Sequence, residues 1–149
     1  MLSPAPTLTT THRVCGEKPY ILLVDDHEPS LRRLRQVVKG AGYPCVVATS
    51  ATAALSQCEL RRPQVVVTDL AMPNLDGRGL AHWINARYPS LPLILMTGEQ
   101  LDPAALATLR QTFTAVFLKP IDLDRFLNWL DRLMPSERIL EPTLTYVPD

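Results

Sequence analysis

Hydrophobic residues along the chain form five short runs, and the segments between them repeat their hydrophobic positions with the spacing of a helix. The runs are rich in β-branched residues or leucine, and they lie at Tyr20 to Val24, Pro44 to Ala48, Gln64 to Thr68, Leu91 to Met96 and Thr114 to Leu118. Strands that alternate with helical segments are typical of a parallel sheet covered by helices. The pattern therefore predicts an α/β fold with a doubly wound, five-stranded parallel sheet.

Five helices are predicted, one after each strand. Their expected ranges or starts are about Pro29 to Gly40 or Gly42, a start at Ser50, about Gly79 to Tyr88, a start at Asp102-Pro103, and a start after Asp122. Serine or aspartate before a helix, and proline in its first turn, are common start signals. The first and fifth helices have clear apolar stripes, formed by Leu31, Leu34, Val38 and Ala41 and by Leu123, Phe126, Leu127, Leu130, Leu133 and Met134.

The strands and helices define one domain with an extension at each end. Residues 1–18 are rich in threonine and proline without an apolar period, so we expect a flexible N-terminal extension. Residues 19–134 hold all five strand and helix pairs, and residues 135–149 are expected to be a C-terminal tail. Nothing in the sequence resembles a signal peptide or reaches the ~20 apolar residues that span a bilayer. We therefore expect a cytoplasmic protein.

Composition and charge are those of an ordinary globular domain. The 149 residues are 46% hydrophobic and 20% charged, with a formal net charge of zero. A neutral chain has no global electrostatic footprint for nucleic acid or for a membrane surface, so neither partner is expected. The three cysteines, Cys15, Cys45 and Cys58, are irregularly spaced, which argues against a disulfide framework and a zinc site. Cys45 and Cys58 fall on apolar positions and are predicted to be core residues.

Four of the five predicted strands are followed by a group that can carry out chemistry. Asp25-Asp26 follow the first strand, Asp69 the third, Thr97 the fourth and Lys119 the fifth. The carboxyl ends of parallel strands meet at one edge of a sheet, which is where ligands bind in such folds. We therefore expect these side chains to lie together.

The chemistry of this set favours a site that accepts a phosphoryl group. Three carboxylates at close range repel one another unless a cation is present, and Mg²⁺ prefers one or two protein carboxylates with room for water and phosphate. A carboxylate can act as a nucleophile, while an ammonium and a hydroxyl can stabilise the charge on phosphoryl oxygens.

The same residues resemble the response regulator receiver domain of two-component signalling. The resemblance is carried by Asp25-Asp26, by the run from Asp69 through Met72-Pro73 to Asp76-Gly77, by Thr97 and by Lys119-Pro120, in this order. It covers residues 20–134, and it implies a flavodoxin-like receiver fold with strand order 2-1-3-4-5, two helices on one face of the sheet and three on the other.

The resemblance also implies a role for each residue of the site. Asp69 would be phosphorylated by a histidine kinase or a histidine phosphotransfer protein. The residues that would hold Mg²⁺ are Asp25, Asp26, Asp69 and Ala71, the last through its main-chain carbonyl. Thr97 would bind the phosphoryl group and move with it, and Lys119 would pair with it. The bond between Lys119 and Pro120 would be cis, which X-Pro bonds adopt at low cost.

One position departs from the family pattern. The family usually has tyrosine or phenylalanine three residues before the lysine, where this chain has Val116 followed by Phe117. Two explanations stay open: Phe117 takes over the role of the switch aromatic, or the signal is transmitted without an aromatic switch. His27, directly after the two acids, is interpreted as an exposed loop residue rather than a metal ligand.

The sequence thus predicts a phosphorylation-dependent switch or phosphorelay protein that signals through a partner protein. It would be a phosphoacceptor rather than an enzyme that turns over a substrate, and it would form a homodimer or act alone. One alternative is a receiver-like scaffold that signals without phosphate, favoured only by Val116. Another is a phosphohydrolase of the haloacid dehalogenase type, but the Asp-x-Asp pattern of that class is absent, since His27 follows Asp26.

Overall fold

The computed structural model describes residues 18–135 and contains one parallel sheet. Its strands are β1 (Ile21–Val24), β2 (Cys45–Ala48), β3 (Val65–Asp69), β4 (Leu93–Thr97) and β5 (Ala115–Leu118), in the order β2-β1-β3-β4-β5. Every neighbouring pair is parallel. The predicted fold class and strand order are therefore confirmed. The extension and tail predicted at the ends of the chain lie outside the described residues, apart from Lys18 and Pro135.

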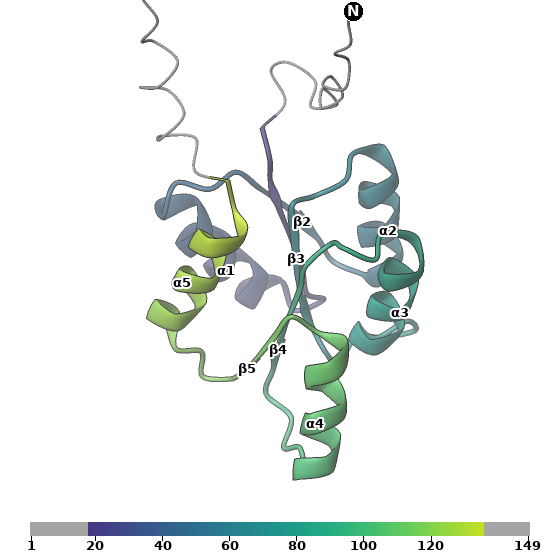
Figure 1. Cartoon of the computed structure of the whole chain (residues 1–149). Helices are drawn as coiled ribbons and strands as arrows, with labels where there is room; N and C mark the ends of the chain where they lie inside the picture. Colours follow the sequence, from purple (N-terminus) through teal and green to yellow (C-terminus); the bar gives the residue numbers. More distant parts are fainter. Residues whose placement is uncertain (1–17, 136–149) are drawn as a thin grey trace, which may run out of the picture.

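Five helices cover the two faces of the sheet. They are α1 (Glu28–Gly40), α2 (Ala51–Leu60), α3 (Gly77–Arg87), α4 (Pro103–Thr112) and α5 (Leu123–Leu133). Figure 1 shows α1 and α5 together on one side of the sheet, with α2 and α3 on the other. The buried residue of α4, Leu109, packs in the same cluster as those of α2 and α3. The two faces thus carry two and three helices, as expected for a doubly wound sheet.

Short polar side chains fix where four of the helices begin. Ser50, Asp76, Asp102 and Asp122 each accept a hydrogen bond from the main-chain N–H three residues further on. Such caps satisfy backbone donors that have no partner inside the helix. The predicted starts of the second, fourth and fifth helices are therefore confirmed to within a residue.

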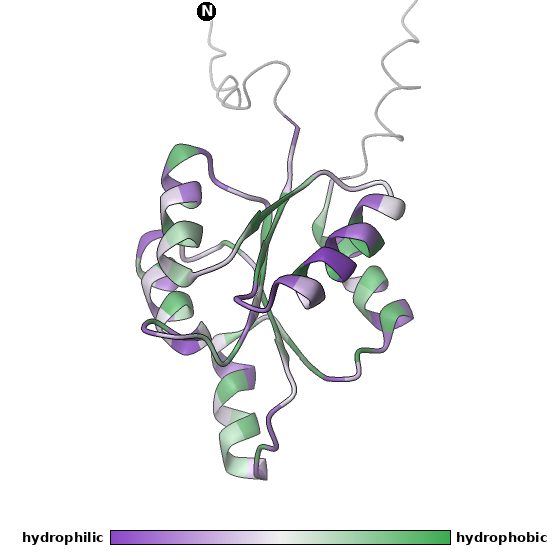
Figure 2. Ribbon diagram, turned by 180° about the vertical axis from the view of Figure 1, so that it is seen from behind, coloured by the Kyte–Doolittle hydropathy of each residue, from purple (hydrophilic) through white to green (hydrophobic). Residues whose placement is uncertain are grey.

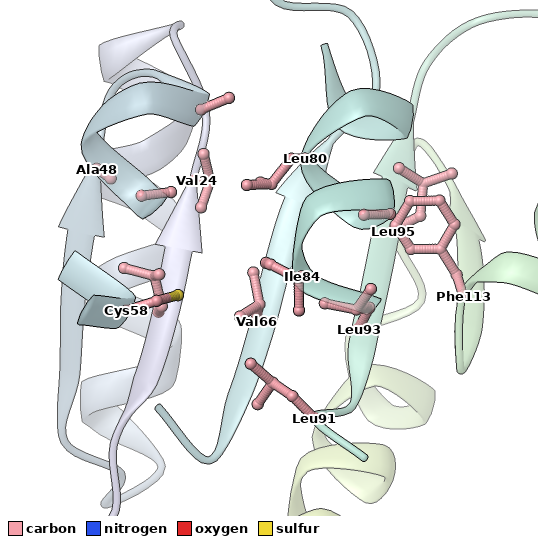
Figure 3. Close-up of a cluster of buried hydrophobic side chains, with 14 of the residues drawn as sticks. Val24, Ala48, Cys58, Val66, Leu80, Ile84, Leu91, Leu93, Leu95 and Phe113 are labelled. Carbon is pink, nitrogen blue, oxygen red and sulfur yellow. The ribbon is translucent and has the colours of Figure 1, made fainter. Parts of the chain in front are cut away.

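Two hydrophobic clusters fill the space between the sheet and its helices. Odd and even residues of each strand point to opposite faces, so Leu22 and Val66 belong to one cluster while Ile21 and Val67 belong to the other. Figure 3 shows the first cluster, in which Ile84 of α3 lies against the strands. In Figure 2 the strands are mostly hydrophobic and the helices alternate between hydrophobic and hydrophilic residues. Burial on both sides explains why the strand sequences are continuous apolar runs.

The structure corrects three details of the sequence prediction. Helix α3 begins at Gly77 rather than Gly79, because Asp76 is its cap and Gly77 its first residue. Ala41 follows the last residue of α1 and is exposed rather than part of the apolar stripe. Leu123, the first residue of α5, is 45% exposed. All three lie at helix ends, where periodicity no longer determines which face is buried. Within the described residues, no helix is long and apolar enough to cross a bilayer.

Cys58 of α2 is predicted to be unreactive in the folded protein. Its side chain is 2% exposed, and burial raises the pKa of its thiol to about 11. Because the thiolate is the reactive form, only about one molecule in a thousand would be reactive at pH 8. Alkylation at pH 8 followed by peptide mapping should modify Cys58 only after denaturant is added, whereas the partly exposed Cys45 should react first. Equal rates at both cysteines in the native protein would contradict this prediction.

Candidate functional site

The carboxyl ends of β1 and β3 bring three aspartates together. Asp25 and Asp26 follow β1 directly, and Asp69 is the last residue of β3, which pairs with β1. One carboxylate oxygen from each residue lies within 4.8 Å of the others. Asp25 is buried, Asp69 is partly buried and Asp26 is exposed. The cluster therefore opens toward solvent through Asp26.

The buried member of this cluster is held by the start of α1. The main-chain N–H of His27 donates a 3.0 Å hydrogen bond to Oδ1 of Asp25. Burial raises the pKa of the Asp25 carboxyl above its usual value; the His27 hydrogen bond and Lys119 oppose this rise, whereas Asp69 and Asp26 add to it. An added cation would favour the ionised form of all three acids. Hard oxygen donors at this spacing fit a divalent ion such as Mg²⁺.

The ammonium group of Lys119, the residue after β5, faces the acids. Nζ of Lys119 lies 3.3 Å from Oδ1 of Asp69 and 4.0 Å from Oδ2 of Asp25. The Lys119 side chain is 36% exposed, so the ion pair is partly screened by water. The peptide bond from Lys119 to Pro120 is cis. Lys119 thus contacts both Asp69 and Asp25, and its charge offsets part of theirs.

Thr97 ends β4 and is completely buried. Its hydroxyl accepts a 3.0 Å hydrogen bond from the main-chain N–H of Glu99, and its carbonyl accepts a 2.8 Å bond from the N–H of Lys119. A hydroxyl has one proton to donate as well as two acceptor sites. The Thr97 hydroxyl therefore retains a proton for another acceptor while it orders the loop that follows β4.

The loop from β3 to α3 returns closely to the end of β3. The N–H of Gly77 donates a 2.8 Å hydrogen bond to the carbonyl of Leu70, and Asn74 adopts a positive φ of 68° within the loop. A Cβ atom on Gly77 would lie 2.4 Å from the main-chain oxygen of Asp69. Only glycine allows this approach, so Gly77 sets the distance between the start of α3 and Asp69.

An open hollow of about 450 Å³ adjoins the acidic cluster. Its lining residues come from the end of β1, the loop after β3, the start of α3 and the loop after β4, and they are Asp26, Leu70, Ala71, Met72, Pro73, Asp76, Arg78 and Glu99. Asp26 belongs to both the hollow and the acidic cluster. A solute in the hollow would therefore lie next to the acidic cluster.

The unusual Val116 and the residue after it, Phe117, point to opposite faces of the sheet. Val116 packs against the cluster that faces α2, α3 and α4, and Thr97 lies on the same side because it is two residues after Leu95 of that cluster. Phe117 is 3% exposed and packs edge-to-face against Phe126 of α5, with ring centroids 5.8 Å apart. Thr97 and Val116 therefore lie on the same face of the sheet, and Phe117 lies on the other.

Two residues near the site have roles that sequence reasoning missed. His27 is exposed and is the N-terminal cap of α1, because its Nδ1 accepts a 3.3 Å hydrogen bond from the N–H of Ser30. Histidine is not among the preferred caps, so no sequence signal indicated this. Arg78 lines the hollow from the first turn of α3. The sequence does show a charged residue directly after Asp76-Gly77, but the direction of the Arg78 side chain depends on the path of the loop before α3.

Comparisons with known proteins agree with this geometry. The family model of the response regulator receiver domain matches residues 21–131. The transcriptional regulator NtrC of Klebsiella pneumoniae is 32% identical over 110 residues, which cover 74% of this chain and 24% of that protein. The C4-dicarboxylate transport regulator DctD of Rhizobium meliloti is 30% identical over 122 residues, which cover 82% of this chain and 26% of that protein. The chain thus spans about a quarter of the length of these curated relatives.

Solved structures show the same fold. A receiver domain of an HD domain-containing protein from Pseudomonas fluorescens has 32% identity and a TM-score of 0.71, covering 78% of this chain and 94% of its own. A response regulator receiver protein from Pseudomonas putida has 26% identity and a TM-score of 0.72, covering 79% of this chain and 99% of its own.

Proposed function

Because the chain belongs to the response regulator receiver family, we propose that it is a switch operated by phosphorylation of Asp69. The observation that carries the proposal is the position of Asp69 between two further carboxylates and an ammonium. Its carboxylate lies within 4.8 Å of Asp25 and Asp26 and 3.3 Å from Nζ of Lys119. The three carboxylates suit a bound cation, and the ammonium of Lys119 suits the negative charge of a phosphoryl group.

The residues that would hold Mg²⁺ are Asp25, Asp26, Asp69 and the main-chain carbonyl of Ala71. The oxygen chemistry of the three-aspartate cluster supports this assignment. When bound, the ion would neutralise charge on the carboxylates and on the entering phosphoryl oxygens. The half-buried position of Asp69 leaves its carboxylate accessible as a nucleophile.

In the proposed transfer, a carboxylate oxygen of Asp69 attacks the phosphorus of a phosphohistidine on a histidine kinase or phosphotransfer protein. A new P–O bond forms, the P–N bond breaks, and its electron pair returns to the imidazole nitrogen of the donor. Lys119 pairs with the phosphoryl oxygens, and Thr97 donates its hydroxyl proton to one of them. Water later cleaves the acyl phosphate and releases inorganic phosphate, so the protein is a phosphoacceptor and turns over no other substrate.

The signal would leave the site through the loop after β4. The Thr97 hydroxyl is bonded to the N–H of Glu99, so movement of Thr97 toward a phosphoryl group would pull on this loop and on α4 behind it. Helix α4 buries only one residue completely, Leu109, which makes its displacement cheap. Val116 offers no aromatic ring to rotate, and Phe117 faces α5. We therefore propose transmission through the loop and α4 rather than through an aromatic switch.

The proposed partners are a kinase or phosphotransfer protein upstream and a protein target downstream. The matched relatives NtrC and DctD are named as transcriptional regulators, and this chain matches only their receiver portion. Direct binding to nucleic acid is not proposed, because the chain has no net positive charge. A phosphate-independent scaffold is the second candidate, and the observation that favours it is Val116 at the switch position.

The proposal is tested by intact-protein mass after incubation with acetyl phosphate. We expect one phosphoryl adduct in the presence of Mg²⁺ and none when the metal is chelated. The adduct should be removed by hydroxylamine, which cleaves acyl phosphates but not phosphate esters of serine or threonine. A folded protein that gains no adduct at saturating Mg²⁺ would favour the scaffold instead.

A further inference from the structure

The hollow beside Asp69 is lined by three acids and one basic side chain. Asp26, Asp76 and Glu99 carry negative charge, and among its described lining residues only Arg78 is a cation. A phosphoryl donor that enters through this hollow meets these acids, and a donor with two negative charges would be repelled by them at short range. Lys119 does not line the hollow and is already engaged with Asp69 and Asp25.

Neither the helix nor an ion pair accounts for the position of Arg78. It is the second residue of α3, and a positive charge in the first turn of a helix is opposed by the helix dipole. Within residues 18–135, no acidic side chain lies within 4.0 Å of its guanidinium, and no hydrogen bond involves it. The side chain is exposed, so it contributes no buried packing. What remains is its place on the wall of the hollow.

Building on the proposed function of Asp69, we propose that Arg78 recognises the phosphoryl donor and selects for donors that carry two negative charges. The guanidinium presents a rigid fork of N–H groups that matches phosphate oxygens, and it would meet the donor from the wall of the hollow. Lys119 then receives the same phosphoryl group at Asp69. Arg78 and Lys119 would thus act in succession, the first on entry and the second on the transferred group.

A simpler role for Arg78 would be to offset the charge of the acids around it. In that case a lysine at this position would restore the rate fully, because it carries the same charge. Recognition of the donor makes a different prediction, because lysine lacks the planar fork of N–H groups and would recover only part of a loss that appears in the KM of the donor.

The test compares Arg78→Ala, Arg78→Gln and Arg78→Lys with wild type at saturating Mg²⁺. Initial rates of adduct formation would be followed by intact-protein mass with acetyl phosphate, which is a dianion at neutral pH, and with phosphoramidate, which is mainly a monoanion. With acetyl phosphate, we expect the alanine and glutamine variants to be phosphorylated ~tenfold more slowly than wild type, because the KM for this donor rises. With phosphoramidate the decrease in rate should be clearly smaller. Arg78→Lys should recover part of the loss, and raising the salt should shrink it.

The matched control is Arg110→Ala, which removes an exposed cation from the last turn of α4 without any ion pair in the described part of the chain. It should leave both rates unchanged. Equal losses with both donors, no loss with either, or full recovery in Arg78→Lys would overturn the role of Arg78 while the wild-type adduct still upholds Asp69. Failure of the wild type to gain an adduct would overturn the proposed function itself.

Discussion

Asp69→Asn is expected to gain no phosphoryl group under any condition in which the wild type gains one. The substitution keeps the size of the side chain and replaces the nucleophilic carboxylate with an amide, which cannot form an acyl phosphate. It also removes one of the three carboxylates that lie within 4.8 Å of one another. We expect metal binding to weaken about tenfold as well, because a ligand charge is lost. Intact-protein mass and titration with Mn²⁺ followed by electron paramagnetic resonance would measure the two effects.

The matched control for this variant is Asp76→Asn. Asp76 also lines the hollow, and it caps α3 through a 3.0 Å bond from the N–H of Gly79. Asparagine caps helices as well as aspartate does, so this change removes a charge while keeping the cap. The Asp76 variant should still gain one adduct. An adduct on the Asp69 variant would move the phosphoacceptor to another residue, and Asp26 would be tested next.

The positions of Asp25, Asp69, Thr97 and Lys119 could be anticipated because parallel strands align their ends. Each of these residues lies at the end of an apolar run, and the order of strands brings all four to one edge. The strand register also explains why Asp25 and Asp69 are neighbours. Val24 of β1 lies beside Thr68 of β3, and the two acids are the residues that follow them. Periodicity and strand order thus suffice for groups that are attached to strands.

Side chains carried by loops and helix starts could not be placed in the same way. Arg78 reaches the hollow only because the loop after β3 turns back at Asn74 and closes onto Leu70. His27 caps α1 through one ring nitrogen, which depends on a side-chain rotation that no sequence period encodes. Phe117 lies on a strand, and alternation shows only that it faces away from Val116; that α5 covers its face follows from the arrangement of the helices. These features depend on three-dimensional paths rather than on spacing.

Gly77→Ala is expected to destabilise the fold by about 1–3 kcal/mol, which is the usual cost of forcing an extra atom into a packed site. The new Cβ would lie 2.4 Å from the main-chain oxygen of Asp69 and 3.0 Å from Cα of Leu70. Both neighbours are backbone atoms at the end of a buried strand, so no side chain can rotate away to relieve the contact. The loss should outweigh the gain in helix propensity of up to about 1 kcal/mol that alanine brings. Urea unfolding followed by circular dichroism would measure it.

The same contact connects stability with phosphorylation. To relieve the clash, either α3 or the end of β3 must move. A movement of β3 would shift Asp69 relative to Lys119, whose Nζ lies 3.3 Å from Oδ1 of Asp69 in the wild type. We therefore expect adduct formation in Gly77→Ala to slow by on the order of tenfold even where the protein is fully folded, because small displacements of a nucleophile are costly. Gly40→Ala is the control, since no atom lies within 4 Å of its added Cβ. That variant should be at least as stable as wild type and phosphorylated at the same rate; a loss of stability there comparable to that of Gly77→Ala would mean that the close approach to Asp69 is not the cause.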